Sequence, residues 1–224
     1  MSQKSIVILI SGSGTNLQAI IDAVNHSRIN ARIAAVVSNR ADAPGLKRAS
    51  NADINTVLVE QKENQDRTSY DEALISEIDK FKPDLIVLAG FMRILSNRFI
   101  SHYKDKILNI HPSLLPELKG LHTHRRAIEV SKRMHGASVH FVNTELDSGP
   151  VVIQAEVPVL NNDTEESLAR RVLLQEHIIY PMAIAWFIDG RLKLVGNQIV
   201  LDNKVLRRPA LWKENQLILS EPQQ

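Results

Sequence analysis

Apolar runs alternate with amphipathic segments along the first half of the chain. Short runs rich in β-branched residues predict buried strands, and apolar residues at helical spacing predict the helices between them. Leu17, Ile20, Ile21 and Val24 follow the i, i+3, i+4, i+7 pattern of a helix face. The predicted strands cover residues 5–10, 33–38, 55–59 and 84–89, and the predicted helices include 17–24, 43–50 and 69–80.

The second half follows a less regular pattern. It predicts strands at 106–110, 137–142 and 151–160, a helix at 123–132, and a loop rich in Pro and Gly at 112–121. Asp163 and Glu166 have the spacing of a helix N-cap and its capping-box partner. They predict the start of a long apolar helix toward Phe187. A strand or hairpin is expected after Asp189, followed by a polar end.

This alternation predicts an α/β fold with a single, mostly parallel, doubly wound sheet covered by helices on both faces. The 224 residues suit one large domain. We expect that domain over residues 1–202, divided near residue 103 into a Rossmann-type first half and a second half, with a partly polar tail at 203–224. Ligands of such sheets bind beyond the carboxyl ends of the strands.

Composition narrows the functional class. Hydrophobic residues make up 44% and charged residues 23%, which argues against global disorder and membrane spans. A net charge of +2 with a pI near 8.9 does not indicate a nucleic-acid surface, but it is compatible with a small anionic substrate. The chain has no cysteine, so thiol nucleophiles and thiolate metal sites are excluded. The first apolar run is too short for a signal peptide, so we expect a cytoplasmic protein.

A glycine-rich turn, residues 11–16, links the first strand to the first helix. Backbone N–H groups at a helix start, with the positive end of the helix dipole, form an anion site. A plain helix cap remains an equally open interpretation, since Ser, Thr and Asn favour caps. A dinucleotide site is less favoured because Leu17 replaces the third glycine of the motif and Asn39 stands where an acidic residue would hold a ribose.

Asn109 and His111 end a predicted strand two residues apart, so both side chains leave the same face. An amide can stabilise an oxyanion and an imidazole can move a proton, which together serve acyl transfer. Further along, Asp147 lies in a turn before Gly149 and Pro150. A carboxylate there could tune a histidine or hold a water. A structural histidine and an ordinary turn aspartate remain open alternatives.

A metal site is the competing hypothesis for the histidines. His122 and His124 are spaced like ligands, and His111 and His140 could join them. No segment matches the H-E-x-x-H motif or a Cys/His finger, so we predict no metal.

Several segments together resemble the phosphoribosylglycinamide formyltransferase family, over a stretch from about Ile6 to about Leu194. They are residues 10–18 (ISGSGTNLQ), 87–95 (VLAGFMRIL), 108–116 (LNIHPSLLP), 136–150 (GASVHFVNTELDSGP) and 175–177 (QEH). One departure lies in the loop before Gly120, where the family often has an aromatic residue. Here the loop reads Pro116, Glu117, Leu118, Lys119, which puts loop closure in doubt more than the chemistry.

The resemblance implies roles for particular residues. Asn109, His111 and Asp147 match the catalytic trio. Substrate-binding positions are matched by Gly14, Thr15 and Asn16 for the phosphate and Glu176 for the ribose. Folate-binding positions are matched by the loop before Asp147 and by Arg67, Met92, Arg93, Ile94, Leu95, Asn109 and His140.

The implied reaction transfers a formyl group from 10-formyltetrahydrofolate, the co-substrate, to the amine of glycinamide ribonucleotide in de novo purine biosynthesis. The amine attacks the formyl carbon, Asn109 and His111 stabilise the oxyanion, and Asp147 keeps His111 protonated and orients a water. Neither a metal nor a covalent enzyme intermediate is needed. We expect small-molecule partners only, no nucleic acid or membrane, and a monomer or weak homodimer.

Three alternatives compete with this function. A methionyl-tRNA formyltransferase would carry a sizeable extra C-terminal domain, and a formyltetrahydrofolate hydrolase an extra N-terminal regulatory domain. A silent nucleotide-binding module would explain the glycine turn but would give Asn109, His111 and Asp147 no joint purpose.

Overall fold

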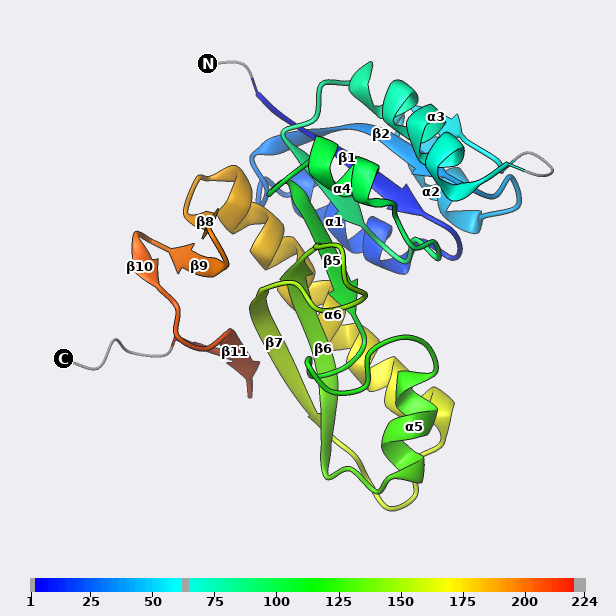
Figure 1. Ribbon diagram of the computed structural model, residues 1–224. Helices are drawn as coiled ribbons and strands as arrows, with labels where there is room; N and C mark the ends of the chain where they lie inside the picture. The colour runs from blue at the N-terminus through cyan, green and yellow to red at the C-terminus, as the bar shows by residue number, and fades with distance from the viewer. Residues whose placement is uncertain (1–2, 62–64, 220–224) are drawn as a thin grey trace. The chain divides into compact units, whose positions relative to one another are not determined.

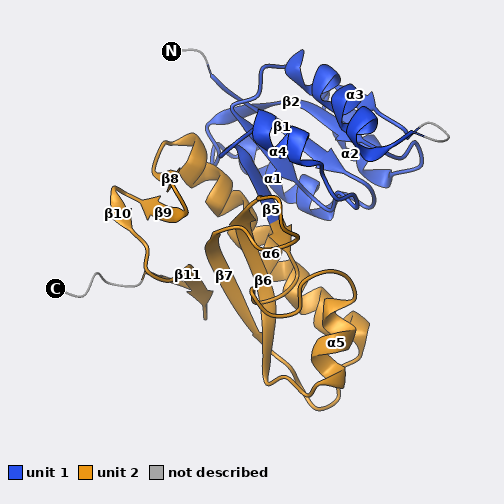
Figure 2. Cartoon of the chain, viewed as in Figure 1, with its two compact units in different colours: residues 1–109 blue, residues 110–224 orange. Residues whose placement is uncertain are grey.

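The computed structural model describes residues 3–61 and 65–219. Contacts divide the chain into two compact units, residues 1–109 and 110–224, which Figure 2 colours separately. Among the described residues, no helix is both long and apolar enough to cross a membrane.

The first unit is a parallel sheet with the strand order β5-β4-β1-β2-β3. Helices lie on both sides of it (Figure 1). The strands are β1 (Lys4–Ile10), β2 (Ala31–Ser38), β3 (Thr56–Leu58), β4 (Leu85–Leu88) and β5 (Ile107–His111), whose last two residues belong to the second unit. The helices are α1 (Thr15–Asn25), α2 (Pro44–Asn51), α3 (Arg67–Asp79) and α4 (Asn97–His102).

Burial on both faces explains the continuous apolar strands of this unit. Six of the seven residues of β1 are buried, and all four of β4. Helix α1 buries three of the four residues that the helical spacing selected, Leu17, Ile20 and Ile21, whereas the fourth, Val24, is half-buried near the end of the helix. Each such side chain contributes about 1.5–3 kcal/mol on burial, so these positions form the core that holds the loops at the carboxyl ends of the strands.

The second unit is built on a long antiparallel pair, β6 (Met134–Phe141) and β7 (Val151–Pro158). Helix α6 (Glu165–Ile188) packs on both strands and also contacts α5 (Thr123–Glu129). On the other side of β7 lies β11 (Ala210–Lys213), parallel to it, followed by the antiparallel β12 (Gln216–Ile218). A separate small sheet contains β8 (Leu192–Val195), β9 (Gln198–Leu201) and β10 (Lys204–Val205).

The predicted α/β class with a mostly parallel sheet is confirmed, and most elements lie within a few residues of their predicted bounds. The capping-box prediction was wrong in its residues. Thr164 is the N-cap of α6 and exchanges hydrogen bonds with Ser167. Asp163 instead accepts from Arg171, which holds the pKa of its carboxyl well below the usual range. Helix α4 was not predicted, because six residues with only Phe99 buried show no clear period.

Candidate active site

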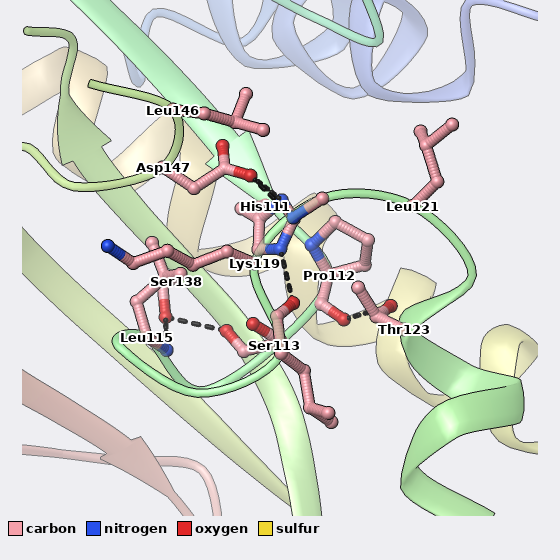
Figure 3. Close-up of polar contacts among 12 residues, drawn as sticks. His111, Pro112, Ser113, Leu115, Lys119, Leu121, Thr123, Ser138, Leu146 and Asp147 are labelled. Atoms are coloured by element: carbon pink, nitrogen blue, oxygen red, sulfur yellow. Dashed lines mark hydrogen bonds and ion pairs between the residues drawn. The ribbon is translucent and has the colours of Figure 1, made fainter. Parts of the chain in front are cut away.

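His111 and Asp147 meet in the second unit (Figure 3). Strand β5 ends at His111, and Pro112 follows it. The Asp147 carboxylate oxygen Oδ2 lies 3.4 Å from His111 Nδ1, and both side chains are less than one-tenth exposed. The fold therefore brings a buried carboxylate to a buried imidazole at the end of a strand, as the sequence interpretation required.

The other ring nitrogen of His111 contacts the backbone of the following loop. Nε2 lies 3.0 Å from the carbonyl oxygen of Leu118. A carbonyl oxygen can only accept a hydrogen bond, so Nε2 carries the hydrogen in this arrangement. Oxygen atoms therefore face both nitrogens of the ring, Asp147 Oδ2 at Nδ1 and the Leu118 carbonyl at Nε2.

Local backbone geometry holds Asp147 in place. The N–H of Gly120 donates to Asp147 Oδ2 over 2.9 Å. Asp147 itself has a left-handed φ of 47°. Two residues later, a Cβ on Gly149 would lie 1.8 Å from the carbonyl oxygen of Phe141, so only glycine fits there. The turn therefore packs closely against the end of β6, and the Asp147 carboxylate lies beside His111.

His140, which the resemblance assigns to the folate pocket, is the second histidine beside Asp147. Its Nε2 lies 3.8 Å from Asp147 Oδ1, and its Nδ1 lies 2.9 Å from the carbonyl oxygen of Phe141. Burial lowers the pKa of His140 to about 4. His140 is therefore neutral at neutral pH.

The loop between β5 and α5 is tied down by hydroxyl groups, several of which Figure 3 shows. Ser138 on β6 donates to the Ser113 carbonyl over 2.6 Å and accepts from the Leu115 N–H over 3.0 Å. Thr123 donates to the Pro112 carbonyl over 2.6 Å. These hydrogen bonds fix the backbone of the loop, which places the Leu118 carbonyl beside His111 Nε2.

Lys119, in the part of the loop that departs from the family pattern, closes the loop onto the Asp147 turn. Its Nζ donates to the hydroxyl of Ser148. Its carbonyl accepts from Arg126 Nη1 over 2.6 Å. The departure therefore still supplies polar contacts that hold the loop.

Asn109 lies two residues before His111 on β5. It is half-buried and is opposite Leu88 of β4 in the register of the first unit. Its proposed part in oxyanion stabilisation stays a prediction, based on its place on the strand that ends at His111.

The glycine turn belongs to the first unit. Gly14 is the N-cap of α1 with φ 70°, and no side chain caps the helix there. A Cβ on Gly14 would lie 2.7 Å from the Cα of Gly45, and the Gly45 N–H donates to the Gly12 carbonyl over 3.0 Å. Thr15 and Asn16 begin the helix. The N-cap is thus a glycine and not the Ser, Thr or Asn that a plain cap would use, and the anion site stays a prediction.

The segment after β4 alternates buried and exposed apolar side chains. Phe91 and Leu95 are buried, whereas Met92 is 67% and Ile94 53% exposed. The guanidinium carbon of Arg93 lies 3.9 Å from the centre of the Tyr70 ring. Exposed apolar side chains on a fixed backbone suit contact with a flat, partly apolar ligand.

Arg67 and Glu176 are the remaining two predicted binding residues. Arg67 is exposed at the first position of α3. Glu176 is 7% exposed within α6. Arg67 lies in the first unit and Glu176 in the second, and each assignment stays a prediction.

The candidate metal ligands have other surroundings. His122 is exposed, and His124 Nδ1 lies 3.1 Å from His135 Nε2. Burial lowers the pKa of both His124 and His135, in the latter to about 4. Within residues 3–61 and 65–219, no group of three or more His, Asp or Glu side chains is arranged to hold a metal ion.

This chain is similar to known proteins over most of its length. The formyl transferase family model matches residues 4–184. The phosphoribosylglycinamide formyltransferase of Escherichia coli is 55% identical over 90% of this chain and 95% of its own, and that of Haemophilus influenzae is 48% identical over 94% and 100%. The solved structure of the Coxiella burnetii phosphoribosylglycinamide formyltransferase has a TM-score of 0.87 and 51% identity, covering 92% of this chain and 96% of its own.

The chain belongs to the phosphoribosylglycinamide formyltransferase family. The sequence reasoning missed three contributors to the site of this family member, namely Leu118, Lys119 and Ser148. Leu118 acts through its backbone carbonyl, which no side-chain pattern reveals. Lys119 and Ser148 are polar loop residues that only the folded chain brings together.

Proposed function

We propose that this protein transfers a formyl group from 10-formyltetrahydrofolate to the amine of glycinamide ribonucleotide in purine biosynthesis. The observation that carries the proposal is the buried His111–Asp147 pair at the end of β5. It occurs in a chain that is 55% identical to the E. coli phosphoribosylglycinamide formyltransferase.

The reaction needs one C–N bond to form and one to break. The acceptor nitrogen bonds to the formyl carbon, the bond from that carbon to the folate nitrogen breaks, and one proton moves from the attacking amine to the folate nitrogen. His111 Nε2 donates to the oxygen that becomes negative, with the Asn109 amide beside it on β5. Groups in such roles each contribute about 10²- to 10⁴-fold in rate.

The Leu118 carbonyl takes the position at which the oxyanion would accept from His111. Nε2 has one hydrogen, which lies toward that carbonyl over 3.0 Å. Productive binding therefore requires the formyl oxygen to replace the Leu118 carbonyl at Nε2, while Asp147 keeps its place at Nδ1.

Substrate binding divides between named elements. The proposed phosphate site is the start of α1, at Gly14, Thr15 and Asn16, with Glu176 at the ribose. The proposed folate site includes Arg67, His140 and residues 92–95. Support comes from the glycine turn with left-handed Gly14 at the start of α1 and from the exposed Met92 and Ile94. Cytoplasmic location, a monomer or weak homodimer, and the absence of nucleic-acid and membrane partners stay predictions.

The decisive assay mixes the purified protein with 10-formyltetrahydrofolate, with and without glycinamide ribonucleotide, and follows deformylated folate and formate. Folate deformylation that depends on the acceptor, without formate release, is the expected result. Formate release in the absence of acceptor would instead identify the hydrolase. No folate turnover under either condition would remove the transferase function.

A further inference from the structure

A single buried hydroxyl, that of Ser11, contacts the segment that follows β4. Ser11 comes directly after β1 and is 6% exposed. Its N–H donates to the Gly90 carbonyl over 3.0 Å. Its Oγ accepts from the Met92 N–H over 2.8 Å and donates to Asn39 Oδ1 over 2.6 Å. Ser11 thus holds the start of the 90–95 segment through two hydrogen bonds, one to the Gly90 carbonyl and one from the Met92 N–H.

The same residue begins the glycine turn. Gly12 follows it directly, and the Gly12 carbonyl accepts from the Gly45 N–H over 3.0 Å. A displacement of Ser11 therefore moves the first residue of the turn and the backbone of Met92 together. Ser11 is joined to the rest of the turn through its peptide bond to Gly12, and to the 90–95 segment through its hydrogen bonds with Gly90 and Met92.

The far end of the 90–95 segment has its own anchor. The Ser96 N–H donates to Asp71 Oδ2 over 2.5 Å, and Asp71 is 1% exposed. Between the two ends, Arg93 packs on the Tyr70 ring, whose hydroxyl donates to the Val59 carbonyl over 2.8 Å. The segment is therefore held at both ends, but only the Ser11 end is shared with the glycine turn.

We propose that Ser11 is a positioning residue that couples the two substrate sites, linking the turn that binds the acceptor phosphate to the segment that binds the folate. The proposal rests on the function proposed above. Its physical basis is that the hydroxyl has one proton, given to Asn39, and accepts from Met92 at the same time. Binding that orders the turn then also orders the Met92 backbone, and the converse holds by reciprocity.

The test compares Ser11→Ala with Ser11→Thr, which keeps a hydroxyl. Ser11→Ala should raise KM for both substrates about five- to tenfold, as expected for a buried N–H left without its acceptor. Ser11→Thr should recover most of the loss. A general loss of folded protein would lower the active fraction without raising both KM values. A rise in one KM only, or in neither, would overturn the coupling.

Two further variants distinguish the coupling through Ser11 from a general loss of order in the first unit. Ser5→Ala removes a buried hydroxyl from the other end of β1, where Oγ donates to the Phe81 carbonyl over 3.3 Å. It should leave both KM values unchanged. Asp71→Ala releases only the far end of the 90–95 segment, so it should raise the folate KM alone. If Asp71→Ala raised the KM values of both substrates equally, the two sites would be linked without Ser11, and the proposal would be overturned.

Amide hydrogen exchange in the unmodified protein provides a test that needs no variant to fold and no catalysis. Adding glycinamide ribonucleotide, or inorganic phosphate as the simplest probe, should slow exchange at the Met92 N–H. Unchanged Met92 exchange while the residues 14–16 become protected would overturn the coupling. A protein that transfers no formyl group but shows this protection would overturn the function and leave the coupling standing.

Discussion

His111 donates from Nε2 to the backbone carbonyl of Leu118, seven residues further along the chain. The loop thus occupies the donor that the proposed reaction needs for its oxyanion. Asp147 faces the opposite nitrogen, so it would keep the ring oriented if the formyl oxygen replaced the Leu118 carbonyl as proposed.

Replacing Asp147 with Asn should keep the size of the side chain and remove the charge that faces His111 Nδ1. We expect kcat to fall about 10²- to 10⁴-fold, since the carboxylate orients the ring that donates to the oxyanion and this effect is greatest in the transition state. Both KM values should change less. Steady-state kinetics with both substrates is the measurement, and near-normal turnover would return Asp147 to an ordinary turn residue.

Replacing Lys119 with Met should release the loop from Ser148 while keeping the length of the apolar stem. We expect faster proteolysis within residues 112–122 and a folate KM raised about threefold to tenfold, equivalent to about 1 kcal/mol of a lost charged hydrogen bond. Lys104→Met, at an exposed position just beyond α4, is the matched control. Equal resistance of the two variants to proteolysis would show that the Lys119–Ser148 contact does not hold the loop.

Stability should depend on pH through the buried histidines. Burial lowers the pKa of His135 and of His140 to about 4, from an ordinary value near 6.5. The unfolded chain therefore binds more protons between about pH 6.5 and pH 4. The stability that these neutral rings provide is complete above about pH 6.5 and is lost as the pH falls toward 4.

For His135 the loss amounts to about 3 kcal/mol at most. Urea unfolding at pH 7.0, 5.5 and 4.5 measures it, and His135→Gln should flatten the dependence. His26→Gln, at an exposed position, serves as the control and should leave the dependence as it is. An identical pH dependence in the His135 variant would contradict the assignment.

Removing the phosphate from the acceptor should lower kcat/KM by about 10²-fold or more. Binding energy from a remote phosphate helps to position the attacking amine, so its loss affects the chemical step as well as binding. The comparison uses the nucleotide and the nucleoside acceptor under identical conditions. Comparable kcat/KM values would remove the start of α1 from the proposed substrate site.

Much of the fold could be predicted from local pattern. The apolar runs that became β1, β2 and β4 and the spacing of Leu17, Ile20 and Ile21 depend on neighbours within one element, so the sequence displays them directly. Asp71 shows the limit of this reasoning. An acidic residue on a helix is expected in solvent, but Asp71 is buried, and its carboxylate accepts from the N–H of Ser96, which is 25 residues further along the chain.

The sequence by itself determined the α/β class, the glycine turn and the strand that carries Asn109 and His111, and its motifs were specific enough to indicate the family. The family resemblance had also assigned Asp147 to His111, and the structure shows the two side chains in contact. Only the tertiary structure decided which carbonyl lies at the other nitrogen of His111 and that β11 pairs with β7. These contacts join residues far apart in the chain, and backbone groups form several of them. Side-chain periodicity contains no information about either, because it reports only which face of an element is buried.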